Sequence, residues 1–475
     1  MRKSALGAAL AVLTSATVFG GFSAFAASPH ANTPVTVSVS ATNGTQVGTG
    51  FAGFSYEKDQ VGADVFSSTD TNLVNLFRLL GPNIIRIGGN LVDIVNWNAA
   101  GAGGSDTEVA PSDVVKLAGF LRATGWKVIY GINLKINTAA NAASEARFAS
   151  RVLGKSLLAF EIGNEPNFYD TQAQYEASFN SYVSAIRAVA PHAVFDGPGQ
   201  GDKTDWVGTF AQDEKANGLT MLTTHFYIGA NTIGTIPGML ASTASGRLPA
   251  TETLMDGARA AAGIPQWRMT ETNSYFHGGT AGVSDVQAAA LWSLNYMAGI
   301  AANNGAGINF HGGTSSQFPL NYTPIVYSGI TPTGVQGVYY GELLWVLAGT
   351  GAYHSASVTG ASGVTAWGIG RNVFVDNESS AAITATITMP ARAHNASEYV
   401  MTAPSLASNA ITIAGSAVNV RGSFHPAPQR VSVAGNQVVI NVPADSAALV
   451  VTRERARCSS AVCATGSGPG PGRRP

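Results

Sequence analysis

Two glutamates stand in sequence contexts that suit acid/base chemistry. Glu165 lies in an Asn-Glu-Pro-Asn segment that follows an apolar run, and Glu271 lies in a Thr-Glu-Thr segment. A glycosidic bond is hydrolysed by one carboxylic acid that protonates the leaving oxygen and one carboxylate at the anomeric carbon, about 5–5.5 Å apart in retaining enzymes. Only 12% of the residues are charged. We therefore expect a catalytic pair here; the alternatives are lone loop glutamates or salt-bridge partners.

Eight short apolar runs, separated by stretches with helical periodicity, lie between residues 50 and 345. This alternation is typical of βα repeats, and eight repeats match a (β/α)8 TIM barrel better than an open sheet. Glu165 and Glu271 then follow the fourth and seventh strands, where the C-terminal ends of barrel strands carry catalytic groups. The predicted strands are Phe51–Tyr56, Asn83–Gly88, Lys127–Leu134, Leu157–Gly163, Ala193–Gly197, Met221–Tyr227, Gln266–Thr270 and Gly307–His311.

A second domain is predicted after the barrel. Residues 350–453 contain alternating β-rich runs separated by turn signals, which predicts an antiparallel β-sandwich. Residues 35–45 show the same alternation and are expected to add an N-terminal strand to that sandwich. Examples of these runs are Val364–Ile369, Asn372–Asp376, Ala381–Met389, Ala410–Val418, Gln429–Val433 and Gln437–Val442.

Both ends of the chain differ from the body in composition. Residues 1–26 combine Arg2 and Lys3 with an apolar run and a final Ala-Phe-Ala, which predicts a secretory signal peptide and a secreted protein, extracellular or periplasmic. A membrane anchor is the alternative, but the run is short for a bilayer span, so we expect no membrane association after cleavage. Residues 454–475 are predicted to be a disordered tail. This tail holds the only two cysteines, Cys458 and Cys463, which could pair in an oxidising compartment.

Several function classes are excluded by composition or by missing motifs. The chain has 27 basic and 28 acidic residues, so it lacks the basic field that nucleic-acid binding requires. A G-x-G-x-x-G pattern spans Gly48–Gly53, but it precedes a strand and opens no helix, so no dinucleotide cofactor is expected. The sequence contains no His-Glu-x-x-His and no G-x-S-x-G motif. We expect no metal and no cofactor.

Three motifs carry a resemblance to known enzymes: Glu-Ile-Gly-Asn-Glu-Pro-Asn at residues 161–167, Arg-Ile-Gly-Gly-Asn at 86–90 and Asn-Phe-His-Gly-Gly at 309–313. The two glutamate contexts resemble the large clan of retaining glycosidases whose acid/base and nucleophile follow barrel strands four and seven. Over residues 35–452 the chain is most similar to glycoside hydrolase family 79, the heparanase and β-glucuronidase family. Members of that family have a signal peptide, an early strand, a barrel and a C-terminal β-sandwich in this order.

The resemblance implies roles for individual residues. Glu165 is expected to be the acid/base and Glu271 the nucleophile that forms a glycosyl-enzyme. Asn164 is expected to hold the sugar 2-hydroxyl, and Tyr227 to hydrogen-bond the nucleophile. The remaining hydroxyls are assigned to Glu57 and Asn90, although Glu57 could instead be a cap or a core salt-bridge partner.

The carboxylate of a glucuronide needs a receptor, and no strong cationic candidate stands at strand ends seven or eight. The loop Gly312-Gly313-Thr314 could offer backbone N–H groups, and Tyr275 a hydroxyl. If this loop holds a neutral hydroxymethyl group instead, the substrate is a β-glucoside or β-galactoside.

Three further polar residues are expected to support the site. Glu161 is expected beneath it as a buried carboxylate, paired with Arg86. His225 and His311 are interpreted as orienting or core histidines.

The function expected from these observations is a monomeric, secreted, retaining β-glucuronidase whose substrate is a β-glucuronide oligosaccharide or glycoconjugate. The alternatives are an endo-acting, heparanase-like hydrolase, a neutral-sugar β-glycosidase of the same clan, and a non-catalytic carbohydrate-binding protein.

Overall fold

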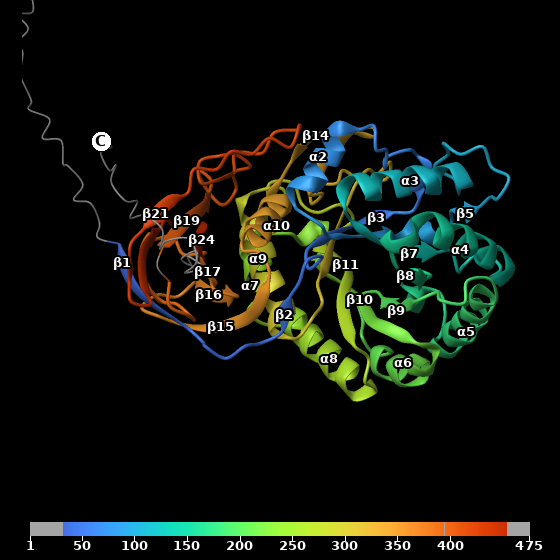
Figure 1. Cartoon of the computed structure of the whole chain (residues 1–475), viewed down its shortest axis with the longest axis horizontal. Helices are drawn as coiled ribbons and strands as arrows, with labels where there is room; N and C mark the ends of the chain where they lie inside the picture. Colours follow the sequence, from blue (N-terminus) through green and yellow to red (C-terminus); the bar gives the residue numbers. More distant parts are fainter. Residues whose placement is uncertain (1–31, 394, 454–475) are drawn as a thin grey trace, which may run out of the picture.

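The computed structural model places a closed barrel beside a large β-sheet domain (Figure 1). It describes residues 32–393 and 395–453. The predicted signal peptide, the predicted tail and both cysteines lie outside the described residues. Within the described residues, no helix is long and apolar enough to cross a lipid bilayer.

Eight parallel strands close into the barrel, which confirms the predicted (β/α)8 fold and all eight predicted strands. Their near-continuous apolar sequences fit strands that are buried on both faces. In chain order β8 is the fourth barrel strand and β11 is the seventh. The strands are β3 (Gly53–Glu57), β4 (Ile84–Gly88), β7 (Lys127–Ile132), β8 (Leu157–Ile162), β9 (Phe195–Gln200), β10 (Leu219–Ala230), β11 (Gln266–Phe276) and β12 (Ile308–Gly312).

The helices between the strands begin and end with the expected capping chemistry. The Asp70 side chain accepts from the Leu73 N–H at the start of α2, and Gly125, with φ of 78°, ends α3 in the left-handed region. The helices are α1 (Asp59–Gly62), α2 (Thr71–Leu79), α3 (Pro111–Thr124), α4 (Ala139–Leu153), α5 (Gln172–Val189), α6 (Val207–Glu214), α7 (Ile236–Ala241), α8 (Arg247–Ala262), α9 (Gln287–Ala302) and α10 (Gly337–Leu347).

Two barrel strands extend well beyond their predicted ends. β10 and β11 stay paired from Met221 and Gln266 to Ala230 and Phe276. The register between them shifts between Thr224 and His225, so the pairing is irregular there. Both strands are therefore longer than the other barrel strands, and the added part of β11 carries the polar residues Thr272, Asn273 and Ser274.

The second domain is a 12-stranded sheet that folds into two layers. The predicted N-terminal strand is confirmed: β1 (Thr33–Val39) pairs with β15 (Gly351–Thr359) and with β18 (Ile383–Thr388). The predicted antiparallel sandwich is confirmed, with one parallel pair in it, β1 beside β18. Alternate residues of β1, including Val37, are buried in the core between the layers.

The predicted sandwich strands are mostly confirmed, with one large difference. The predicted run Ala410–Val418 forms only the two-residue strand β20 (Thr412–Ile413), whereas β15, β19 and β24 lie in the predicted sandwich region outside the runs given as examples. The other strands are β16 (Val364–Ile369), β17 (Asn372–Asn377), β19 (Asn395–Thr402), β21 (Gln429–Val431), β22 (Val433–Ala434), β23 (Gln437–Val442) and β24 (Ser446–Arg453). Short strands β2 (Gln46–Val47), β5 (Asn96–Trp97), β6 (Glu108–Val109), β13 (Ile325–Ser328) and β14 (Thr331–Val335) complete the fold.

Aromatic packing joins the barrel to the sheet domain through α10. The Trp345 ring stacks on Phe51 at 5.1 Å and on Phe374 of β17 at 5.7 Å. At the nearby start of α9, Gln287 donates its side-chain N–H to the Asp445 carbonyl. Helices α9 and α10 lie between the barrel and the sheet in Figure 1, so the sheet domain packs against the outside of the barrel through these helices.

Candidate active site

The two glutamates meet at the C-terminal end of the barrel. Glu165 follows β8 and Glu271 lies within β11, and a carboxylate oxygen of one lies within 4.8 Å of a carboxylate oxygen of the other. Retaining glycosidases hold their carboxyl groups about 5–5.5 Å apart, whereas inverting enzymes need about 6.5–9.5 Å to admit a water. The spacing in this chain therefore fits double displacement.

Glu165 is held by its backbone and by one histidine. Its φ of 47° and ψ of 51° lie in the left-handed region, which is costly for a residue with a side chain and is concentrated at functional sites. Its N–H donates to the Gly199 carbonyl at 3.1 Å, and its Oε1 lies 3.0 Å from His225 Nδ1. A Cβ atom on Gly201 would lie 2.4 Å from the Glu165 Cδ atom. Glycine at position 201 is thus what leaves room for the Glu165 carboxyl.

Glu271 is buried and bonded on both oxygens. Arg86 Nη1 lies 2.5 Å from Oε2, and the Tyr227 hydroxyl donates to Oε1 at 2.9 Å. Burial alone would raise the pKa of Glu271, but His311, His225, Arg86 and the Tyr227 bond together lower it to about 2. Glu271 is therefore an anion at neutral pH, which is the state that a nucleophile needs.

Arg86 binds several of these groups beneath the site. Its Nε donates to Glu161 Oε1 at 2.6 Å, and its Nη2 donates to Asn164 Oδ1 at 2.8 Å. The predicted pairing of Glu161 with Arg86 is confirmed, and Glu161 is buried as expected. The guanidinium therefore fixes the nucleophile and Asn164 relative to each other.

Asn164 is oriented by its neighbours as well as by Arg86. Its backbone N–H donates to Asp93 Oδ2, which also accepts from the Tyr169 hydroxyl at 2.9 Å. Its Nδ2 donates one hydrogen bond to Asn90 Oδ1, with 3.2 Å between the two atoms. Nδ2 carries two hydrogens, so Asn164 keeps a donor for a substrate hydroxyl.

Glu57 lies at the end of β3, across the barrel mouth from Glu165. Its Oε2 accepts from the Leu91 N–H at 2.7 Å, and its Oε1 lies 3.7 Å from His311 Nε2. Burial raises the pKa of Glu57 well above its usual range, and the negative charge of Glu271 raises it further. Burial lowers the pKa of His311, although Glu271 opposes this. A protonated Glu57 can donate a hydrogen bond to a sugar oxygen.

The predicted receptor for a sugar carboxylate is not formed as expected. Gly313 donates its N–H to Thr323 Oγ1 at 2.9 Å, and Thr314 donates its N–H to Gln60 Oε1 at 3.0 Å. These two backbone donors are thus used within the protein. Gly312, the third residue of this loop, ends β12 and is buried.

Tyr275 is also engaged elsewhere. Its hydroxyl donates to the Thr235 carbonyl at 3.1 Å and lies 3.3 Å from the Thr235 N–H. The side chain is buried at the start of α7. The expectation that Tyr275 offers a free hydroxyl to the substrate is therefore wrong in this structure.

Three side-chain donors converge closely enough to raise the question of a metal. Glu165, His225 and Glu271 each place one ligand atom within 4.8 Å of the others. Arg86, however, contacts Glu271 directly and would repel a second cation. Tyr227 also occupies the other Glu271 oxygen. The trio suits proton transfer better than metal binding.

Comparison with solved structures identifies the group of enzymes that shares this fold. A 4-O-α-L-rhamnosyl-β-D-glucuronidase from Fusarium oxysporum 12S matches with a TM-score of 0.67 and 21% identity, covering 87% of this chain and 99% of its own. An α-L-arabinofuranosidase from Thermotoga maritima matches at 0.64 with 13% identity, covering 88% and 99%. A glycoside hydrolase family 39 enzyme from Xanthomonas axonopodis pv. citri matches at 0.59 with 16% identity, covering 89% and 97%.

These neighbours are glycoside hydrolases, and the chain has the fold of their clan. No protein-family model matches the chain, and no curated protein matches it in sequence. The resemblance to family 79 therefore stays a prediction.

Two supporting residues were not predicted as part of the site. Asp93 accepts from Asn164, as described above, and a polar side chain just past a strand was its only sequence signal. Tyr322 packs beside Tyr227 with ring centroids 6.2 Å apart, and it comes from a loop that carries no motif. His225 and His311 take the orienting positions that the sequence indicated, next to Glu165 and Glu57.

Proposed function

We propose that this protein is a retaining β-glycoside hydrolase that uses Glu165 and Glu271. The observation that carries the proposal is the approach of their carboxylate oxygens to within 4.8 Å, with Glu271 bonded by Arg86 and Tyr227. A carbohydrate-binding protein has no need for an ionised carboxylate facing a second carboxyl group at this distance. The catalytic alternative is therefore favoured over the binding alternative.

The proposed reaction has two steps. In the first, a Glu271 oxygen attacks the anomeric carbon, the glycosidic C–O bond breaks, and Glu165 gives its proton to the leaving oxygen. In the second, Glu165 takes a proton from water, the water oxygen attacks the same carbon, and the ester bond to Glu271 breaks. Asn164 is placed to donate to the sugar 2-hydroxyl, a contact that strengthens in the transition state.

For the substrate class we propose β-glucuronides. The motifs shared with family 79 support this, and one similar structure is that of a rhamnosyl-β-D-glucuronidase. A neutral β-glycoside is the second candidate, because the backbone donors of Gly313 and Thr314 are already used. The same proposal includes export and a monomeric state. Recovery of the protein from outside the cell checks export, and size-exclusion chromatography checks the monomeric state.

The test is hydrolysis of 4-nitrophenyl β-glucuronide, β-glucoside, β-galactoside and β-xyloside. Wild-type protein is compared with Glu165→Gln, Glu271→Gln and a control, Glu176→Gln, on the outer helix α5. We expect glucuronide turnover that falls by at least about 10³ in both active-site variants and persists in the control. Turnover of a neutral sugar alone would move the substrate to the second candidate. Equal turnover in wild type and both variants would overturn the mechanism.

A further inference from the structure

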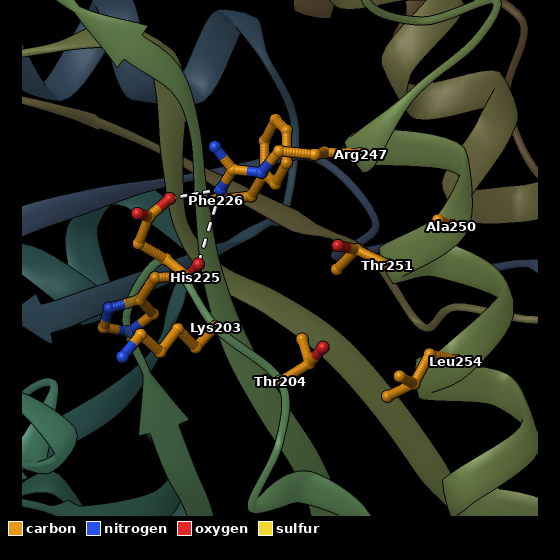
Figure 2. A pocket seen from close by; sticks show the side chains of 9 residues that line it. Lys203, Thr204, His225, Phe226, Arg247, Ala250, Thr251 and Leu254 are labelled. Atoms are coloured by element: carbon orange, nitrogen blue, oxygen red, sulfur yellow. Dashed lines mark hydrogen bonds and ion pairs between the residues drawn. The ribbon is translucent and has the colours of Figure 1, made fainter.

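A cavity adjoins the acid/base on the side away from Glu57. Its volume is 210 Å³, and it lies between the segment after β9 and the first turns of α8. Figure 2 shows Lys203 and Thr204 on one side, with Arg247, Thr251 and Leu254 of α8 facing them. The reaction proposed above uses none of these side chains.

His225 connects this cavity to the chemistry. Its ring lines the cavity, and its Nδ1 lies 3.0 Å from Glu165 Oε1. The acid/base must contact the leaving oxygen, so the leaving group lies on the Glu165 side of the anomeric carbon. The expected glycone contacts, Glu57 and Asn90, lie on β3 and just after β4, which are on the opposite side of the barrel from β9 and β10. The cavity is thus located where a leaving group would extend.

The charges that line the cavity are mainly positive. Lys203 and Arg247 carry two positive charges, and Asp202 carries one negative charge. Arg247 and Asp202 form an ion pair, with both side chains 54% exposed. Lys203 is exposed at the same wall. The ion pair offsets the charge of Arg247, so the lining keeps the net positive charge of Lys203, and this charge beside the acid/base favours an anionic ligand.

Apolar surface accompanies the cations. The Arg247 guanidinium carbon lies 5.3 Å from the centroid of the Phe226 ring, and Phe226 and Leu254 both line the cavity. A planar or sugar-like ring could therefore contact apolar atoms while its charged group reaches Lys203 or Arg247. The volume of 210 Å³ suits one such ring.

We propose that this cavity is a leaving-group subsite for an aglycone that carries an oxyanion, either a carboxylate or a sulfate. Lys203 and Arg247 would bind the oxyanion, and Phe226 and Leu254 would contact the ring. The inference rests on the proposed function, because it takes Glu165 as the acid/base. It adds a specificity for acidic leaving groups that the proposed function does not require.

The experiment compares phenyl β-glycosides that share one glycone and differ at ring position 4, which carries nitro, carboxylate or sulfonate. Each is measured with wild type, Lys203→Gln, Arg247→Gln and the control Lys215→Gln, an exposed lysine at the far end of α6. For each glycoside, kcat/KM is expressed relative to wild type, so differences in leaving-group acidity cancel. Equilibrium binding of the same glycosides to Glu271→Gln, with and without Lys203→Gln, gives a readout that needs no turnover.

We expect Lys203→Gln and Arg247→Gln each to lower kcat/KM for the anionic glycosides roughly tenfold, mainly through KM, as loss of a charge-assisted bond would do. The nitrophenyl glycoside and the control variant should change less than about twofold. Carboxylate and sulfonate substrates then show which oxyanion is preferred. Equal losses for charged and neutral aglycones, or unchanged binding of the anionic glycosides, would overturn the inference. A different result would contradict the proposed function itself: turnover of the nitrophenyl glycoside that is the same in Glu165→Gln as in wild type.

Discussion

Arg86 Nη1 lies 2.5 Å from Glu271 Oε2, and both side chains are almost completely buried. The same guanidinium bonds Glu161 and Asn164, so three polar groups of the site depend on one cation. A buried pair of this kind contributes little net stability but is costly to break, because the remaining charge loses its partner. Its consequence for chemistry is larger, since it keeps Glu271 ionised and correctly oriented.

Tyr227→Phe should raise the pKa of Glu271. The hydroxyl bond at 2.9 Å is one of the interactions that stabilise the anion, and phenylalanine keeps the ring packing against Phe276 and Tyr322. We expect the acidic limb of the kcat/KM profile to move to higher pH and the plateau to fall about tenfold. Tyr399→Phe, in the sheet domain, is the control. An unshifted acidic limb would show that Tyr227 does not support the nucleophile.

Gly201→Ala should displace the acid/base while leaving the fold intact. The added Cβ atom would lie 2.4 Å from the Glu165 Cδ atom, so the carboxyl must move. We expect kcat/KM for 4-nitrophenyl glycosides to fall about 10²-fold, and less for 2,4-dinitrophenyl glycosides, whose leaving group needs less protonation. Gly208→Ala, with open space around its new Cβ, should behave as wild type. Equal losses on both substrates would contradict the assignment of Glu165.

Stability should fall as the pH rises from about 4.5 to about 8. Burial raises the pKa of Glu252 to about 8 from a usual value of 4.5, and Glu252 is only 3% exposed. The folded protein therefore holds this proton more tightly than the unfolded chain does. The contribution of this proton to the free energy of unfolding is complete below pH 4.5. It is lost between pH 4.5 and 8, by up to about 1.4 kcal/mol per pH unit. Thermal melts at pH 6 and 8.5 measure the fall.

Glu252→Gln tests the source of this pH dependence. Glutamine cannot lose a proton, and it keeps a side-chain oxygen for the bond from Asn303. We expect the difference in Tm between pH 6 and pH 8.5 to shrink in this variant. If the difference in Tm is as large as in wild type, the effect comes from other buried carboxyls. One of these is Glu378, because burial raises its pKa to about 7.

The N-terminal strand should be essential for the stability of the sheet domain. Val37 is fully buried between the two layers, and Val37→Ala removes two methyl groups from that core. We expect a loss of about 2 kcal/mol and a lower Tm. Ser38→Ala, on the exposed side of the same strand, should change stability by less than about 0.5 kcal/mol. Equal Tm values for the two variants would contradict the placement of β1.

Much of the barrel could be predicted because its strands are apolar on both faces. The extension of β11 could not, because its buried residues are polar, as in Thr272, Asn273 and Ser274. These side chains find partners from distant segments, such as the His311 carbonyl for Asn273. The extension of β10, residues 228–230, is only partly buried and carries no alternating pattern. Strand β15 gives a weak sequence signal, because Ser355, Ser357 and Thr359 face solvent and small residues such as Ala352 and Ala356 lie on its inner face.

The active site likewise contains residues that could be predicted from the sequence and residues that could not. Glu165 and Glu271 could be identified from local motifs, since their strands fix where they meet. The errors at Gly313, Thr314 and Tyr275 arose because their partners, Thr323, Gln60 and Thr235, are distant in sequence or follow no motif. Competition for a hydrogen bond between such segments is a property of the folded chain, and sequence spacing does not reveal it.

The most direct test of the central claim is trapping of the glycosyl-enzyme. An activated 2-deoxy-2-fluoro β-glycoside of the preferred sugar is incubated with the protein, and the peptides are analysed by mass spectrometry. We predict one label per chain, on Glu271, and no label in Glu271→Gln. A label on another carboxylate, or hydrolysis of the parent glycoside with inversion of the anomeric configuration, would contradict the account.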